Sequence, residues 1–237
     1  MSYGLLRSKE LEETLARLRR RIGERFPESG LSHLAQEVSG ALKDAQERSA
    51  WISRANIPLR ICTGIFVVVV LIVTLLGLWG LNLDLRTSTL TDFVQMLEAG
   101  TNDLILLGAA FYFLFSFERR VKRRRAMHAF HKIRSLIHMV DMIQLTKDPG
   151  KILTGLKPTA SSPEQKLTGA LLSRYLDYCS ELLSLLAKIT VLYGQHFDDP
   201  AVQQAVDGVE DLCNGISTKI WQKIMINAEG QRVIELN

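Results

Sequence analysis

The stretch ICTGIFVVVVLIVTLLGLWGL at residues 61–81 contains 21 residues without a single charge. A helix needs about 20 apolar residues to cross the hydrocarbon core of a bilayer. Because a backbone in lipid has to satisfy its hydrogen bonds internally, this stretch should be helical despite its run of valines. Pro58 suits the first turn of such a helix, and Trp79 suits the membrane interface near its far end. The sequence therefore predicts a first transmembrane helix.

A second apolar segment follows, in which residues 104–117 form a charge-free run of 14 residues. At about 1.5 Å per residue this run spans about 21 Å, which is too short to cross a bilayer alone. We therefore predict that the helix begins earlier, near Asp92 or Phe93. Its aromatic-rich end at 111–117, followed at once by Glu118, Arg119 and Arg120, favours a membrane span. The alternative is a single-span protein whose second helix is buried.

Basic residues predict the orientation of this hairpin, because positively charged segments beside a span stay in the cytoplasm. The connecting segment 82–103 carries one arginine and four acids. Both flanks are basic, with Lys43, Arg48, Arg54 and Arg60 before the first span, and Arg119, Arg120, Lys122, Arg123, Arg124 and Arg125 after the second. We expect a multi-pass inner-membrane protein with a short outward loop at 82–92 and both termini in the cytoplasm. The first 50 residues lack the apolar region of a signal peptide, so the first span is the expected targeting signal.

Outside the hairpin, apolar residues recur at helical spacing. Helices are predicted at 8–25, from a cap at Ser32 toward the membrane, from the second span to about Thr146, from Thr168 to Gln195, and from Pro200 to about Asn227. A linker is expected at 151–166. No segment alternates as a strand does, so the expected fold class is all-α. It comprises a two-helix transmembrane hairpin and a cytoplasmic helical bundle, formed by long C-terminal helices and N-terminal amphipathic helices. The predicted domains are 1–56, 57–118 and 119–237.

The three cysteines are predicted to be small buried residues. Cys62 falls in the first apolar run, whereas Cys179 and Cys213 lie on the apolar faces of predicted helices. Their spacing resembles neither a zinc site nor a disulfide framework. A reducing cytoplasm fits this usage.

Polar and small residues recur along one side of the second span. At 100° per residue, one stripe contains Gln95, Glu98, Asn102, Ala109, Tyr112 and Ser116. The opposite side contains Leu104, Leu107, Phe111 and Leu114 and is expected to face lipid. Because polar groups facing lipid are costly, the stripe should face protein, within the hairpin or in a homo-oligomer. The alternative is a water-lined path with Glu98 and Asp103 at its outer mouth.

The basic run from Arg119 to Arg125 is a candidate site for anionic lipid headgroups. Nucleic acid is the alternative ligand of such a cluster. Because the cluster directly follows a predicted span, we expect a lipid bilayer as partner and no nucleic acid.

Two further groups of titratable residues suggest chemistry. His128, His131, His138 and Asp141 are weak metal candidates, since imidazole and carboxylate are suitable ligands. One helix cannot bring all four to one ion, so we interpret them as a solvated helix flank and expect no metal. Asp177 and Glu181 stand four residues apart, with Arg174 three residues before Asp177. We interpret these three as surface ion pairing rather than as an acid–base pair.

Three stretches carry a resemblance: HKIRSLIHMVDMIQLTKDP at 131–149, SRYLDYCSELLSL at 173–185 and IWQKIM at 220–225. They resemble an uncharacterised group of bacterial two-span inner-membrane proteins, over roughly the C-terminal half of the chain. The resemblance implies a bacterial inner membrane and brings no functional residues. In architecture only, the layout is also similar to the SLATT class, two-span proteins proposed as membrane effectors in bacterial conflict systems.

The sequence contains no GxxxxGK[ST], GxSxG or HExxH motif, and no GxGxxG after a predicted strand. We therefore expect neither an enzyme nor a cofactor. The favoured function is a non-enzymatic, oligomeric, membrane-anchored interaction or assembly module that can take a cytoplasmic protein partner. The alternative is a small oligomeric ion channel or pore-forming effector lined by the second transmembrane helix.

Overall fold

The computed structural model describes residues 7–53, 57–80, 90–150, 160–161, 167–195 and 197–235. Every regular element within these ranges is an α-helix, so the all-α class is confirmed. The chain divides into two compact units, a bundle unit of residues 1–53 and 125–237 and a hairpin unit of residues 54–124. The predicted linker at 151–166 and the outward loop at 82–92 fall mostly outside the described residues.

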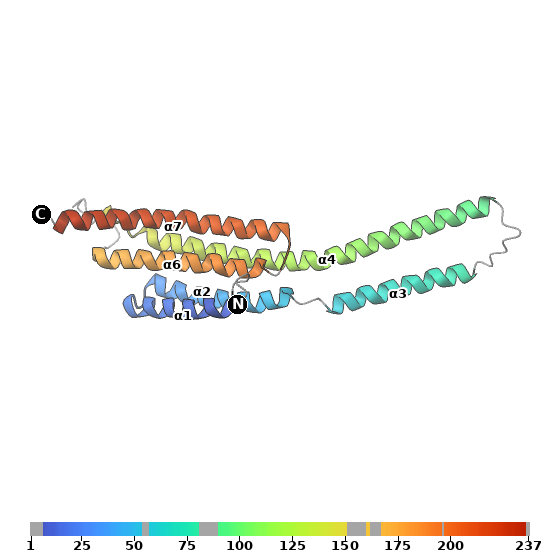
Figure 1. The fold of residues 1–237 in the computed structure, drawn as a ribbon, viewed down its shortest axis with the longest axis horizontal. Coiled ribbons are helices and arrows are strands. Elements are labelled where there is room, and N and C mark those ends of the chain that lie inside the picture. The colour runs from blue at the N-terminus through green and yellow to red at the C-terminus, as the bar shows by residue number, and fades with distance from the viewer. Residues whose placement is uncertain are drawn as a thin grey trace. The chain divides into compact units, whose positions relative to one another are not determined.

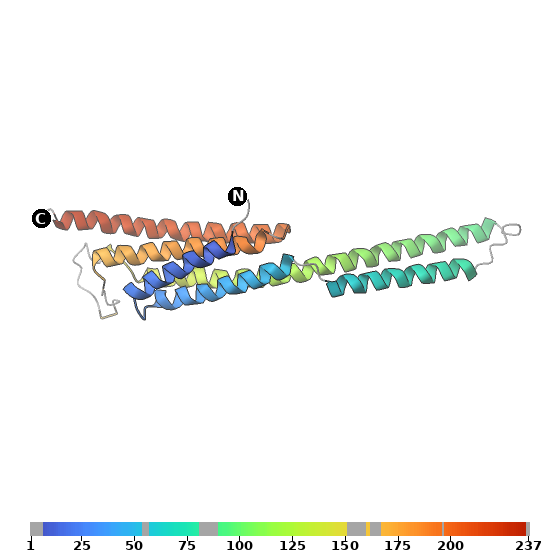
Figure 2. The same cartoon turned by 60° about the horizontal axis from the view of Figure 1, so that its bottom comes forward.

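The hairpin unit consists of α3, Ile57–Gly80, and the first part of α4, Leu90–Leu145. These two helices run side by side (Figures 1 and 2). The second helix begins at Leu90, two to three residues earlier than predicted, and continues unbroken to Leu145. The predicted continuation of this helix to about Thr146 is therefore confirmed.

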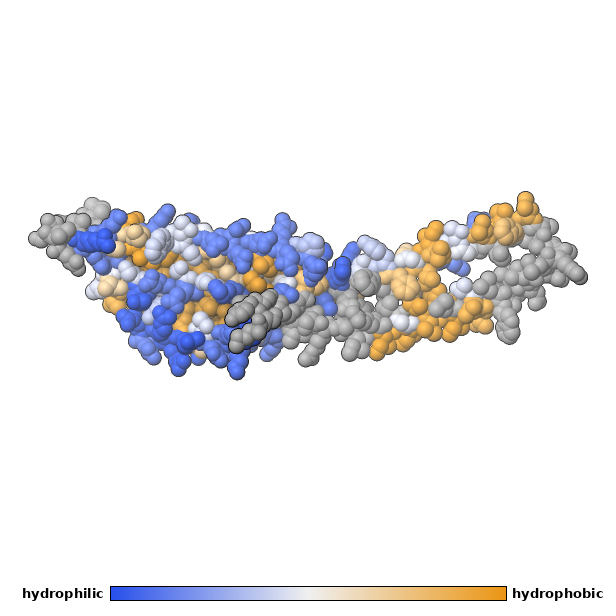
Figure 3. Space-filling view, viewed as in Figure 1, coloured by the Kyte–Doolittle hydropathy of each residue, from blue (hydrophilic) through white to orange (hydrophobic). Residues whose placement is uncertain are grey.

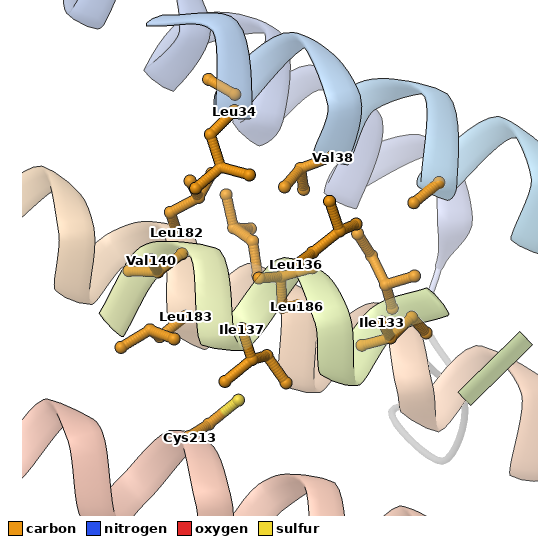
Figure 4. Close-up of a cluster of buried hydrophobic side chains, with 14 of the residues drawn as sticks. Leu34, Val38, Ile133, Leu136, Ile137, Val140, Leu182, Leu183, Leu186 and Cys213 are labelled. Carbon is orange, nitrogen blue, oxygen red and sulfur yellow. The ribbon is translucent and has the colours of Figure 1, made fainter. Parts of the chain in front are cut away.

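The bundle unit contains α1, Ser8–Arg25; α2, Gly30–Ser53; α4 from Arg125 onward; α6, Gly169–Gly194; and α7, Pro200–Glu235. All of these helices contribute to one apolar core. Figure 4 shows side chains from α2, α4, α6 and α7 meeting in it, with Ile137 pointing toward Cys213. The predicted core faces are confirmed, because Leu15, Val38, Ile137 and Leu182 are all at most 1% exposed. The prediction of a helical bundle is therefore confirmed.

The start of α2 differs from the prediction, which placed its cap at Ser32. The helix begins at Gly30, and the Ser29 hydroxyl accepts a hydrogen bond from the Ser32 amide at 3.2 Å. Ser29 is therefore the capping residue. The reason is a tight turn, in which the Ser29 hydroxyl also donates to the Phe26 carbonyl at 2.8 Å. Phe26 is held in turn by the rings of Tyr175 and Tyr178 on α6.

The end of α7 was also predicted incorrectly, since the helix continues past Asn227 to Glu235. Asn227 is fully buried and donates to the Gly169 carbonyl and the Ser173 hydroxyl, both at 2.7 Å. Any Cβ at Gly169 would collide with Gln231, so the start of α6 lies directly against this last part of α7. Tertiary packing therefore extends a helix that the sequence predicted to end near Asn227.

Removing the N-cap of α7 gives a first testable prediction. The Asp199 carboxylate accepts from the amides of Ala201 and Val202, at 3.1 and 3.3 Å, and Pro200 occupies the first helical position. The Asp199→Ala substitution should therefore lower the free energy of unfolding by about 1 kcal/mol. Chemical denaturation can measure this loss. The matched control is Asp198→Ala, which removes the exposed neighbouring carboxylate and should change stability by less than about 0.5 kcal/mol.

Candidate functional site

The hairpin unit exposes a large apolar surface, shown in orange along both of its helices in Figure 3. Ile65 and Val73 on α3 are 59% and 64% exposed, and Leu104 on α4 is 71% exposed. Surfaces of this kind mark interaction or membrane sites, because monomeric soluble proteins rarely expose large contiguous apolar patches. Among the residues that the structure describes, no helix is both long enough and apolar enough to cross a membrane.

Several half-buried side chains of the hairpin lie on the side of α4 opposite the polar stripe. These half-buried side chains include Leu107 and Ala110 on α4, and α3 has Val67 and Val70 in the same class. Leu107 was predicted to face lipid, but its partial burial places it toward α3.

The polar stripe of the second span is turned away from this contact. Five of its six residues are exposed, namely Gln95, Glu98, Asn102, Ala109 and Tyr112, and Ser116 is half-buried. Asp103, the further pore candidate outside the stripe, is also exposed. The hairpin therefore does not bury the stripe against its own first helix. The stripe must therefore face either another molecule or water.

The basic cluster continues the same helix at the boundary between the two units. Lys122 is half-buried, and the exposed members are Arg119, Arg120, Arg123, Arg124 and Arg125. Because successive helical residues are rotated by 100°, these six side chains encircle the helix rather than forming one face. Such a collar can contact phosphate oxygens from several directions.

The histidines of α4 are not gathered into a site. His128, His131 and His138 are exposed, and Asp141 accepts a hydrogen bond from the Gln144 amide at 2.7 Å. Within the described ranges, no three His, Cys, Asp or Glu side chains come together in a way that could hold a metal ion.

The pairing expected of Asp177 and Glu181 is only partly correct. Arg174 does pair with Asp177, at 3.7 Å. Glu181 instead receives two hydrogen bonds of 3.0 Å from the guanidinium of Arg21 on α1, which also lies 5.0 Å from the centre of the Tyr178 ring. These hydrogen bonds, which Arg21 donates to the Glu181 carboxylate, raise the pKa of the Arg21 guanidinium. Glu181 therefore joins α6 to α1 at the surface, whereas Asp177 forms its ion pair within α6.

A polar network between α4 and α7 was missed by sequence reasoning. Gln144 is buried, and its side-chain and backbone oxygens accept from the Lys223 ammonium at 2.7 and 2.9 Å. Burial lowers the pKa of Lys223, against the opposing influence of Asp148 and Asp141. Each partner is a polar residue that looks like an ordinary surface side chain in sequence, so no local pattern predicts the contact.

A groove of about 630 Å³ lies between α1, α6 and α7 in the bundle unit. Its apolar lining includes Leu11, Leu185 and Ile220, and Trp221 stands beside them with 61% of its surface exposed. The sequence offers one signal for the groove, Trp221 beside the apolar face of the last helix. The groove is large enough for the side chains of an added helix or a small ligand.

The cysteines behave differently in the two units. Cys179 and Cys213 are buried as predicted, but the prediction is wrong for Cys62, which is exposed. The reason is that Cys62 belongs to a two-helix hairpin, which is too thin to enclose its side chains. Burial raises the pKa of Cys179 to about 12 and that of Cys213 to about 11.

Thiol alkylation provides a second testable prediction. At pH 8, both bundle cysteines are protonated and covered, so iodoacetamide should modify them at least tenfold more slowly in the folded chain than in unfolded chain. Mass spectrometry of the cysteine peptides measures both rates, and the chain in guanidinium chloride is the control. Equal rates in the two states would contradict the buried placement of these thiols.

Together, the geometry defines a class: an all-helical chain that joins a packed bundle to an apolar hairpin with a polar stripe. Comparison with known protein families, curated proteins and solved structures found no match for this chain. The resemblance to bacterial two-span membrane proteins stays a prediction.

Proposed function

We propose that this chain is a non-enzymatic, membrane-anchored interaction module of a bacterial inner membrane. In this proposal the hairpin lies in the bilayer and the bundle lies at the cytoplasmic surface. The observation that carries it is the exposed apolar surface of α3 and α4, in a chain whose other unit buries its apolar helix faces in one core. Burial of this apolar surface in a lipid bilayer would contribute a favourable free energy of about 25 cal/mol for each Å² removed from water.

Helix lengths support this proposal. The 24 residues of α3 extend about 36 Å, against a hydrocarbon thickness of about 30 Å, and their one charge is Arg60 near the start. The corresponding part of α4 carries Glu98 and Asp103 in its first half. Those acids would lie toward the outer headgroups, and the apolar residues 104–117 would fill the rest of the bilayer.

The collar of basic residues would then meet the inner headgroups. Each Lys or Arg near an anionic surface contributes about 1 kcal/mol, so the six residues from Arg119 to Arg125 would favour this orientation strongly. The same residues keep both termini in the cytoplasm under the positive-inside rule.

The groove of the bundle suits an amphipathic helix of a cytoplasmic protein. Trp221 and Ile224 would pack against the apolar face of such a helix, as aromatic anchors do at interfaces. Asp177 and Glu181 line one stretch of the α6 wall, and Lys188 lies two to three turns farther along. A helix with a basic and an acidic end would match this charge distribution.

Membrane extraction and topology measurements test the anchor. The full chain should stay in the membrane fraction after washing at high pH. A cysteine added near Asn237 should react with an impermeant reagent only in inverted vesicles. Release by the alkaline wash, or labelling of that cysteine from outside intact cells, would overturn the proposal.

Affinity purification from cross-linked membranes tests the interaction role. A specific protein should co-purify with the full chain. Its recovery should fall at least tenfold with the Trp221→Ala variant and should not change with Met142→Ala. Met142 is a matched control because it is 62% exposed, much like Trp221, but does not line the groove. Equal recovery with both variants would contradict binding at the groove.

A cation pore is the second candidate, favoured by Glu98 and Asn102 being exposed on the side of α4 away from α3. Several hairpins would turn these stripes toward a shared water-filled path. Proteoliposomes containing the chain should then conduct cations, and Glu98→Ala should reduce the flux. A chain that conducts nothing in this assay is the result expected of an interaction module.

A further inference from the structure

The polar stripe of α4 has a spacing that goes beyond simple helical recurrence. Gln95, Asn102, Ala109 and Ser116 follow one another at intervals of seven residues. Three residues after each come Glu98, Ile105, Tyr112 and Arg119, which repeat at the same interval. Positions that alternate by three and four residues in this way form the contact seam of two helices that cross at a small angle.

This seam lies opposite the side of α4 that is turned to α3. Leu107, the half-buried contact residue, falls midway around the helix from the line through Asn102, Ile105 and Ala109. Asn102 and Ala109 are exposed, Tyr112 is 77% exposed, and Ile105 is 62% exposed. The seam is therefore available to a further helix without displacing α3.

We propose that a second copy of this chain covers the seam, in a parallel and in-register pairing of two α4 helices. The proposal rests on the membrane location proposed above. Copies inserted with the same orientation in one membrane bring their α4 helices together in parallel. Each residue of the seam then meets its own counterpart.

The chemistry of the seam fits pairing with itself. The Asn102 amide has both donors and an acceptor, so two copies can bond to each other across the interface. An asparagine at this kind of position fixes register in paired helices, and such hydrogen bonds also join helices in membranes. The small Ala109 and Ser116 allow the two backbones to approach closely. Glu98 and Arg119, which would repel their counterparts, stand near the two ends, where water and headgroups reduce the repulsion.

Disulfide formation in native membranes tests this pairing. In a Cys62→Ser background, Ala109→Cys should form a cross-linked dimer on mild oxidation, since counterparts at the seam lie within disulfide reach. Leu104→Cys is the matched control, because Leu104 is 71% exposed but lies to the side of the seam. We expect at least fivefold more dimer from Ala109→Cys. Equal yields from the two variants would overturn the pairing.

A second measurement addresses the hydrogen bond at Asn102. The Asn102→Leu variant should raise the dimer dissociation constant in mild detergent about three- to fifteen-fold, and Leu104→Ala should leave it unchanged. Mass measurement of the detergent complex gives both values. A monomeric wild-type chain at every concentration would also overturn the pairing.

Three outcomes separate this pairing from the proposals on which it rests. Recovery of the chain in the soluble fraction would contradict the membrane anchor, whatever the disulfide yield. A membrane-bound chain whose Ala109→Cys variant forms no disulfide would contradict the pairing alone. If Ala109→Cys reacted only with long bifunctional reagents, the stripes would face each other across a wide space, which contradicts direct pairing and favours a pore.

Discussion

Replacing Leu182 by alanine should lower the free energy of unfolding of the bundle unit by about 3 kcal/mol. Leu182 has no exposed surface and lies at the centre of the core, next to side chains from α2 and α4 in Figure 4. Its truncation removes the transfer free energy of the lost atoms and leaves a cavity that the surrounding helices cannot fully close.

Denaturation of the full chain in mild detergent, followed by circular dichroism, measures this loss. The matched control is Leu145→Ala, since Leu145 is 63% exposed on α4 and should change stability by less than about 0.5 kcal/mol. A loss for Leu182→Ala no larger than that of the control would mean that the core shown in Figure 4 does not stabilise the protein.

Introducing two arginines into α3 should have the largest effect on the membrane location of the protein. The double substitution of Val69 and Ile72 by arginine places two charges in the middle of the proposed first span, on residues that are each about half exposed. Each arginine costs about 2.5–3.5 kcal/mol at the centre of a membrane helix. The combined cost of about 5–7 kcal/mol should abolish stable insertion of the hairpin.

Fractionation after an alkaline wash compares this variant with the wild type. The control adds the same charge to the bundle, through arginines at the exposed positions Asn214 and Gln222 of α7. The control should remain in the membrane, whereas the Val69 and Ile72 variant should be lost from it. If both variants stayed membrane-bound to the same extent, α3 would not be a lipid-embedded helix.

The core of the bundle could be predicted because the spacing of apolar residues within each helix indicates which face is buried. Leucines at Leu11, Leu15 and Leu18 recur at the period of an α-helix, and this recurrence indicates burial regardless of what the partner helix is. The same logic located the start of α7, where Asp199 and Pro200 form a cap from adjacent residues.

The contacts between helices could not be predicted, since they join residues far apart in the chain. Arg21 and Glu181 are 160 residues apart, and Gln144 and Lys223 are 79 apart. Nothing near either residue of these pairs specifies its partner. The groove beside Trp221 could not be predicted either, because its lining comes from three helices, α1, α6 and α7.

The hairpin was predictable in its elements but not in its packing. Counting apolar residues located both helices, yet it suggested that Leu107 faces lipid. Two helices with apolar residues on most sides can meet through several faces, and small differences in side-chain volume decide among them. The polar stripe identified one face of interest without indicating which molecule covers it.

The bundle unit is assembled from both ends of the chain, and this order has a consequence for translation. Residues of α1 and α2 emerge from the ribosome about 140 residues before α6 is complete. Translation proceeds at roughly 5–20 residues per second. The apolar faces containing Leu15 and Val38 therefore remain without their packing partners on α6 for about 7–28 s. During that interval the nascent protein exposes the apolar faces of two amphipathic segments. Its biogenesis should therefore depend on chaperones or on early binding to the lipid surface.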